Sequence, residues 1–340
     1  MAMKAVQSYS AQDYDIRPSR GHDETNKIWY PFMLELGWDR GPADLATYLD
    51  HSQSRGMLLA FPQGSSQPIG HVAAIINDNA TGWVALFIVD KLYQGIGLGA
   101  ALWTEMMKEF EHCNTQYVGL DAVPQQKATY ERRRFVDSEL GQISLMTRPF
   151  HVAIRKSPHV VDSILEIAKV SAHLLAEFEL KYTGFCRPGM WRNLLSRSDV
   201  VGYAVVSQTP KSVGDIHACA FVRRCPSGAR LGPLYANTVH TAETVLSHTL
   251  SACTAEYMQS FPMKGVEMSN WSSDDIHKQA RVVAEIWSGN VEAVALFEKV
   301  GWTSQGHYHR MWLHGRAPAA QGPGGLAQTG VFATFDAATG

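Results

Sequence analysis

The sequence lacks the features that mark several classes of protein. Its five cysteines are odd in number and widely scattered, and no CxxC pair occurs among them. A disulfide framework and a cysteine zinc site are therefore not expected, whereas reduced thiols in the cytoplasm are. Lys and Arg total 30 against 32 Asp and Glu, for a formal net charge of -2. Nucleic-acid binders usually carry a basic excess or stripe, so no nucleic-acid partner is expected.

Long hydrophobic runs are also missing. The longest, such as residues 83–89, have the length of a strand and fall far short of the roughly 20 residues that span a bilayer. Residues 1–10 contain no apolar stretch of the kind a secretory signal needs. The sequence therefore predicts a cytoplasmic protein without a membrane partner.

What is present fits a globular protein with a sizeable core. The chain has 340 residues, a length typical of two domains. Hydrophobic residues make up 45% and charged residues 18%, which excludes a disordered chain.

The two halves of the chain share a pattern. Residues 14–18 read as a short strand, and Asp23 opens the helix after it. A similar strand is expected at residues 152–156, where Asp162 opens a helical stretch over residues 163–170. We therefore expect two diverged copies of one α/β unit, joined near residues 148–151.

Hydrophobic periodicity predicts alternating strands and helices in both halves. Leu102, Met106 and Phe110 recur at a spacing of four and predict an amphipathic helix after residue 99. The apolar face of a corresponding helix is expected over residues 246–257. The expected strands are residues 57–61, 71–76, 83–89 and 116–120, then 202–207, 217–222, 230–236 and 331–335.

The strongest chemical signal is a glycine-rich segment, Tyr93-Gln-Gly-Ile-Gly-Leu-Gly-Ala100, between a strand and a helix. Glycines let the backbone approach a ligand, and free N–H groups at a helix N-terminus bind phosphate. Gly95, Gly97 and Gly99 alternate as GxGxG, which differs from the GxGxxG of dinucleotide-binding folds. No Gly-Lys-Ser/Thr follows, so a Walker loop is excluded. A tight turn without a ligand is the alternative interpretation.

Residues 94–99 resemble the (Gln/Arg)-x-x-Gly-x-(Gly/Ala) signature of GNAT-type N-acetyltransferases. In that family the loop holds the pyrophosphate of coenzyme A, and the strand before it splays from its neighbour and pairs with the pantetheine arm. The resemblance implies acetyl-CoA as the acyl donor. The residues it implies in binding acetyl-CoA are Phe87, Ile88, Val89, Gln94, Gly95, Ile96, Gly97, Leu98, Gly99 and Ala100.

The chain also resembles a two-domain branch of this family, in which a degenerate GNAT-like domain follows an N-terminal GNAT domain. This implies an α/β (α+β) fold of tandem GNAT units, each a mixed, mostly antiparallel twisted sheet flanked by helices. The implied domains are residues 1–148, which bind acetyl-CoA, and residues 149–340. The matching segments are Gly37-Trp38, residues 119–123 with Gln126 and Tyr130, residues 232–236 and residues 331–335.

Two departures from the family pattern have consequences. Arg134 stands where the family's Tyr-x-x-x-Gly-Phe motif has glycine, at a helix end where glycine relieves left-handed strain. In the second half, residues 237–243 lack the glycines of a phosphate loop. We therefore expect one coenzyme site, in the N-terminal domain.

Acetyl transfer requires a neutral amine, and a proton donor assists the departing thiolate. Tyr130 matches the family tyrosine whose phenol reaches the coenzyme sulfur, so the resemblance implies a proton donor there; a packed aromatic is the alternative. Asp121 is the first candidate for the base, and Glu35 and Asp90 are weaker ones, each with a solvated or structural role as its alternative. Such an acidic pocket could equally orient a cationic amine. Glu35 and Trp38 are the candidates for contacting the acceptor, and Trp38 fits a core role equally well.

The sequence therefore predicts an acyltransferase that moves acetyl from acetyl-CoA to the primary amine of a small molecule by direct attack. Amino acids, polyamines, arylalkylamines and aminosugars all fit as acceptors. The alternatives are a GNAT scaffold that binds an acyl-CoA or metabolite as a regulatory module, and a repurposed enzyme with non-acetyl chemistry. No metal is expected, because His307 and His309 have no accompanying ligands. A serine hydrolase is disfavoured because Gly-x-Ser-x-Gly is absent.

Overall fold

The computed structural model describes residues 14–51, 56–153, 163–263 and 265–340. Its strands are β1 (Tyr14–Pro18), β2 (Met57–Pro62), β3 (Gly70–Ile76), β4 (Thr81–Val89), β5 (Tyr117–Ala122), β6 (Phe135–Asp137), β7 (Ile143–Pro149), β8 (Ser163–Glu166), β9 (Val201–Val206), β10 (Ile216–Cys225), β11 (Gly228–Ala236), β12 (Arg281–Trp287), β13 (Thr303–Leu313) and β14 (Val331–Ala333).

The helices cover both faces of the sheet that these strands form. They are α1 (His22–Asn26), α2 (Trp29–Leu36), α3 (Asp44–His51), α4 (Leu98–His112), α5 (Lys127–Glu131), α6 (Ala172–Thr183), α7 (Pro188–Ser196), α8 (Val239–Ala252), α9 (Ala255–Ser260), α10 (Ser273–Gln279), α11 (Val291–Lys299) and α12 (Ala327–Gly330).

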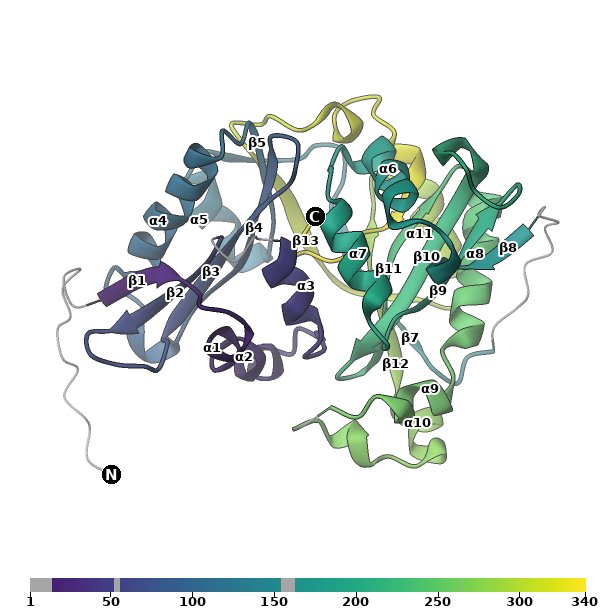
Figure 1. The fold of residues 1–340 in the computed structure, drawn as a ribbon, viewed down its shortest axis with the longest axis horizontal. Helices are drawn as coiled ribbons and strands as arrows, with labels where there is room; N and C mark the ends of the chain where they lie inside the picture. Colours follow the sequence, from purple (N-terminus) through teal and green to yellow (C-terminus); the bar gives the residue numbers. More distant parts are fainter. Residues whose placement is uncertain (1–13, 52–55, 154–162, 264) are drawn as a thin grey trace.

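The strands described join into one 14-stranded sheet that runs through two lobes (Figure 1). The order is β1-β2-β3-β4-β5-β13-β7-β12-β11-β10-β9-β8, with β6 beside β13 and β14 beside β11. We call β1–β6 with α1–α5 the N-terminal lobe, and β7–β12 and β14 with α6–α12 the C-terminal lobe. Pairing is antiparallel except for β4 with β5 and β11 with β12. This mixed, mostly antiparallel architecture confirms the predicted fold class.

The lobes exchange strands. All of β7 except Pro149 precedes the predicted boundary at residue 148/149, yet it pairs with β12 and β13. β13 lies far along the chain, and its second part, His309–Trp312, pairs with β5 of the N-terminal lobe. β13 therefore carries the sheet from one lobe to the other, and the domain boundary stays a prediction.

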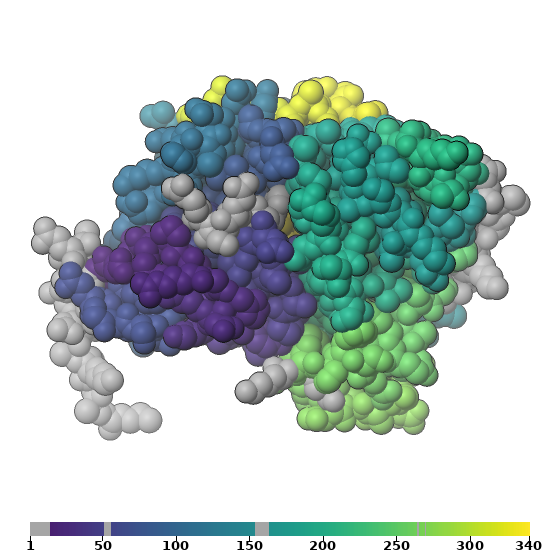
Figure 2. Space-filling view, viewed as in Figure 1, coloured from purple at the N-terminus to yellow at the C-terminus, as the bar shows by residue number. Residues whose placement is uncertain are grey.

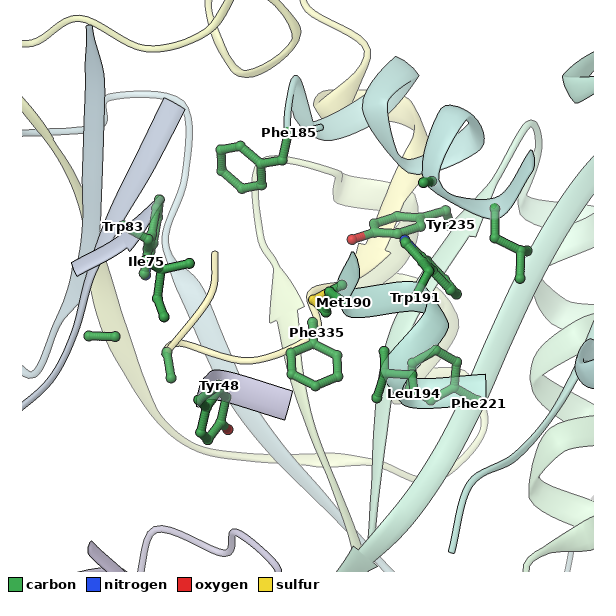
Figure 3. Close-up of a cluster of buried hydrophobic side chains, with 14 of the residues drawn as sticks. Tyr48, Ile75, Trp83, Phe185, Met190, Trp191, Leu194, Phe221, Tyr235 and Phe335 are labelled. Carbon is green, nitrogen blue, oxygen red and sulfur yellow. The ribbon is translucent and has the colours of Figure 1, made fainter. Parts of the chain in front are cut away.

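A shared hydrophobic core fills the junction of the lobes. Figure 3 shows Trp83 of β4 and Tyr48 of α3 on one side, with Trp191 of α7 and Phe221 of β10 on the other. Phe335, near the end of the chain, lies between them and is fully buried. Figure 2 shows the lobes packed against each other, with C-terminal residues (yellow) lying over the top of both. Burial of these aromatic side chains holds the lobes together.

Buried charges also cross the junction. Arg223 of β10 donates from Nε to Asp44 Oδ1 of α3 at 2.9 Å and from Nη2 to Asp336 Oδ2 at 2.8 Å. Arg197 donates to the same Asp44 oxygen at 2.7 Å. Burial alone would raise the pKa of Asp44, but the attraction of Arg223 and Arg197 outweighs it and holds the pKa at about 2. The carboxylate is therefore ionised at neutral pH.

Most of the predicted elements are confirmed. The predicted amphipathic helix after residue 99 is α4, and its apolar face is buried as expected. Arg134 adopts φ 66°, the left-handed conformation in which the family has glycine. Residues 154–156 of the strand expected over residues 152–156 lie outside the described residues.

Two helix predictions were wrong. Residues 163–166 form β8, the edge strand that pairs with β9, and the helix begins only after Ser171, whose hydroxyl caps it. The helix expected through residue 257 ends at Ala252. Thr254 then starts α9 by accepting a hydrogen bond from the Tyr257 N–H.

Candidate active site

A cavity opens where β4 and β5 separate. The two strands pair only from Thr81 to Trp83, opposite Tyr117 to Gly119. Beyond these pairs they diverge around a cavity of about 360 Å³, lined by residues 84–89 of β4 and by Leu120 and Asp121. A bulge accompanies the divergence, since the register with β3 shifts and Leu86 has φ 51°. This edge of β4 pairs with no described strand beyond Trp83, so its polar backbone groups are free to bind a ligand.

The glycine-rich loop lies at the end of β4. Gly95 and Gly97 have φ 79° and 91°, which only glycine adopts readily. Among the described residues, the N–H groups of Gly97, Leu98 and Gly99 donate to no partner. They stand at the N-terminus of the 15-residue helix α4, where free N–H groups and the helix dipole favour an anion.

The predicted coenzyme residues divide into two groups. Phe87, Ile88, Val89 and Gln94 line the cavity. Residues 95–100 lie outside its wall, in the loop and first turn of α4. Gln94 folds back on the end of β4, where its Nε2 donates to the carbonyl of Val89 at 2.8 Å.

Tyr130 of α5 lines the same cavity. Its ring packs against Trp103 and Phe135, with centroids 5.9 and 6.3 Å away. Its hydroxyl bonds to no described residue and is not among the fully enclosed atoms without a partner, so it borders the cavity. Burial raises the pKa of Tyr130 to about 12, which keeps the phenol protonated at neutral pH.

Asp121 also lines the cavity, but its carboxylate is already paired. Arg310 of β13 donates from Nε to Oδ1 at 2.9 Å and from Nη2 to Oδ2 at 2.8 Å. The Asp121 side chain has no exposed surface. Burial raises its pKa, and the attraction of Arg310 opposes this rise only in part. The base role predicted for Asp121 would require Arg310 to release one of these two bonds.

The remaining candidates lie in different surroundings. Trp38, after α2, lines the cavity. Glu35 does not; its exposed carboxylate accepts from Lys91 Nζ at 2.6 Å. Asp90 caps the turn after β4, since its Oδ1 accepts from the Leu92 N–H at 2.8 Å. His309 bonds through Nδ1 with Asp137, and no group of three potential metal ligands occurs in the part of the chain that the structure describes.

Several lining residues were missed by sequence reasoning. Arg40, Tyr308, Ala337 and Ala338 complete the cavity wall. Tyr308 belongs to β13 and the two alanines to the C-terminal segment, so both come from beyond residue 300. No local motif marks them, because the strand exchange alone brings them to this place.

The corresponding gap in the C-terminal lobe is filled by the chain itself. β11 and β12 pair from Gly228 to Leu231, as β4 and β5 do, and then diverge. β14 enters between them and pairs with β11 at Leu234 and Tyr235. On its other side, the N–H of Thr334 donates to the carbonyl of Glu285 in β12 at 2.9 Å. The strand edge that is free in the N-terminal lobe is therefore occupied here.

None of the helices described is long and apolar enough to cross a membrane. Residues 40–144 match the family model of an acetyltransferase (GNAT) domain. The chain is also similar to holothin acyltransferase from Pseudoalteromonas sp. (strain SANK 73390). They are 23% identical over 217 residues, which cover 63% of this chain and 67% of the relative.

Two solved structures share the fold over most of the chain. A protein from Pyrococcus horikoshii, whose acetyltransferase activity is inferred, aligns over 98% of both chains with a TM-score of 0.70 and 18% identity. A tandem GNAT protein from the clavulanic acid biosynthesis pathway aligns over 88% of this chain and 98% of its own, with a TM-score of 0.59 and 10% identity. Residues 40–144 therefore match a GNAT acetyltransferase domain, and the chain as a whole shares the fold of tandem GNAT proteins.

Proposed function

We propose that the protein transfers an acetyl group from acetyl-CoA to the primary amine of a small molecule, in the cavity between β4 and β5. The observation that carries this proposal is the free edge of β4, which leads to three unpaired N–H groups at the N-terminus of α4. An extended amide-bearing arm can pair with such an edge, and a pyrophosphate can bind such N–H groups.

We propose one coenzyme site per chain, within residues 1–148, and a second domain over residues 149–340 that helps to shape the pocket for the acceptor amine. β14 supports this assignment, since it occupies the equivalent gap of the C-terminal lobe. The relative named as a holothin acyltransferase supports a small-molecule acceptor. We also propose a cytoplasmic location, in line with the scattered cysteines, none of which forms a disulfide in the structure.

In the proposed reaction, the amine nitrogen attacks the thioester carbonyl carbon, and the C–S bond then breaks. Tyr130 supports this step by donating a hydrogen bond to the developing thiolate. Its pKa of about 12 lies above the roughly 8.5 of an ordinary thiol, so full transfer of its proton is unfavourable. The proton that the thiol finally carries comes from the attacking nitrogen.

Removal of that proton needs an acceptor. Asp121 is our candidate, because the residue lines the cavity; its enclosed carboxylate acts once one bond from Arg310 is released. That pairing also favours a second candidate function, a module that binds an acyl-CoA without turnover, because a paired carboxylate is a poor base.

Thermal unfolding with acetyl-CoA and with free CoA tests the coenzyme site. A ligand at 100 times its Kd stabilises the folded state by about 2.7 kcal/mol, so a clear rise in Tm is expected for both. An unchanged Tm at millimolar coenzyme would contradict the proposal. Release of free CoA thiol with a panel of primary amines then separates the two candidate functions, since a binding module shows the Tm rise without any release.

A further inference from the structure

One end of the cavity is built from segments far apart in the sequence. Trp38 and Arg40 follow α2, and Tyr308 lies in the middle of β13. Tyr308 stands at the point where β13 leaves β7 and goes on to pair with β5. We call Trp38, Arg40 and Tyr308 the acceptor end. They line the same cavity as the coenzyme residues of β4.

Tyr308 supplies a free donor there. Its hydroxyl bonds to none of the residues that the structure describes, and it is absent from the fully enclosed atoms that lack a partner. The hydroxyl therefore borders open space in the cavity. Burial, followed by the nearby charge of Glu285, raises the pKa of Tyr308 to about 12. The group is consequently a protonated O–H donor at neutral pH.

Arg40 supplies a second donor. Its Nε donates to the Tyr48 hydroxyl at 3.2 Å and its Nη1 to the carbonyl of Trp38 at 3.0 Å. Its Nη2 lies 3.8 Å from Glu285 Oε1, too far for a hydrogen bond, and bonds to no other described residue. The side chain is only 4% exposed, so this donor is buried and lines the cavity.

Arg40 remains charged although it is buried. Burial disfavours its charged form, but the nearby oxygens of Tyr48, Asp336 and Glu285 hold its pKa well above the ordinary value. Among the residues that line the cavity, Asp121 has the one carboxylate, and both its oxygens are bonded to Arg310. Glu285 lies behind Arg40, and its Oε2 is fully enclosed without a partner among the described residues. A second ammonium group, as in a polyamine, would therefore find no unpaired carboxylate among the residues that line the cavity.

We infer that the acceptor amine carries a carbonyl or carboxylate oxygen, bound by the Tyr308 hydroxyl and Arg40 Nη2. The indole of Trp38 adds an apolar wall beside it. This inference rests on the proposed function and names its substrate class. A buried site with two donors rejects an analogue that lacks the oxygen, because both donors would lose their water without gaining a partner.

Three probes of similar size test the inference: phenylalaninamide, phenylalanine and phenethylamine, which lacks the oxygen. The assay follows release of CoA thiol from acetyl-CoA, together with the Tm rise caused by acetyl-CoA alone. We expect kcat/KM for the better of the first two to exceed that for phenethylamine at least tenfold. Comparison of phenylalaninamide with phenylalanine shows whether the site prefers a neutral or an anionic oxygen.

The variant Tyr308→Phe removes a hydroxyl that bonds to none of the described residues, so folding is preserved. Its preference for the oxygen-bearing probe over phenethylamine, as a ratio of kcat/KM values, is expected to fall about tenfold, while the acetyl-CoA Tm rise persists. Tyr203→Phe is the matched control, since Tyr203 lies in β9, away from the cavity lining.

Equal or absent turnover of all three probes, with the acetyl-CoA Tm rise intact, would overturn the inference and leave the coenzyme site standing. Retention of the preference in Tyr308→Phe would overturn it as well. If acetyl-CoA did not raise the Tm of the parent protein, that result would instead contradict the proposed function.

Discussion

At the scale of single residues, the cavity combines groups that sequence reasoning could find with groups it could not. Tyr130 was found because it follows a recognisable strand end in a family-like pattern, and it lines the cavity. Asp121 was found in the same way, but its pairing with Arg310 was not foreseeable. The two residues are 189 positions apart in sequence, so only their meeting in the fold shows that the carboxylate is occupied.

The role of Tyr130 leads to a prediction for Tyr130→Phe. Loss of the hydroxyl is expected to lower kcat by about 100-fold, because the departing thiolate loses its hydrogen-bond donor. KM for acetyl-CoA is expected to change little, since the ring still packs against Trp103. Steady-state kinetics of CoA release measure both constants.

The control is Tyr117→Phe, which removes a hydroxyl from β5 at a position outside the cavity lining. Full turnover by Tyr130→Phe would exclude this tyrosine from the reaction. An equal loss in the control would instead point to a general effect on the sheet.

At the scale of elements, the glycine loop and the divergence of β4 from β5 act together. The sequence predicted the loop because alternating glycines between a strand and a helix form a local pattern. The divergence depends on how far two strands stay paired, which is a property of the sheet. The free edge of β4, which leads to the glycine loop, is therefore known only from the structure.

Gly97→Ala tests the loop. A side chain at φ 91° costs about 1 kcal/mol of stability and shifts the N–H groups at the start of α4. We expect the Kd for CoA to rise at least tenfold, as measured by isothermal titration calorimetry.

Gly64→Ala is the matched control, because Gly64 has φ 74°, also has open space around it, and lies in the β2–β3 turn. It is expected to lose similar stability and to bind CoA normally. Equal CoA affinity in both variants would mean that the loop does not hold the coenzyme.

At the scale of the whole molecule, the strand exchange and the buried charges join the lobes into one structure. Asp44 belongs to the N-terminal lobe, whereas Arg197 and Arg223 belong to the C-terminal lobe. All three side chains are nearly or fully buried. Breaking such a pair leaves uncompensated charge in the interior, which costs about 3–5 kcal/mol.

Asp44→Asn is therefore expected to lower the free energy of unfolding by about 3 kcal/mol, measured by urea denaturation at pH 7. Asp274→Asn, at an exposed position of α10, is the control and is expected to change it by less than about 0.5 kcal/mol. Similar values for both variants would show that the buried charges do not hold the lobes together.

The same carboxylate predicts a pH dependence. The folded pKa of about 2 lies below the ordinary value of 3.8, so the folded state binds fewer protons between these values. The contribution of Asp44 is fully present above pH 4 and is lost as the pH falls towards 2. Asp44→Asn is expected to lose less stability than the parent protein over this range, when Tm is followed against pH.

The sequence by itself determined the features that depend on neighbouring residues. Helical and strand periodicity, the glycine loop and the absence of a second loop after residues 232–236 are local patterns. They predicted two α/β units, and the resemblance of the motifs to GNAT-type N-acetyltransferases implied tandem GNAT folds. Which residues form the acceptor end was determined by the tertiary structure alone. Arg40, Tyr308 and the C-terminal alanines meet there because β13 crosses between the lobes. Burial and hydrogen bonding then determine which of their polar atoms remain free. Both depend on contacts between residues hundreds of positions apart, which no local pattern in the sequence shows.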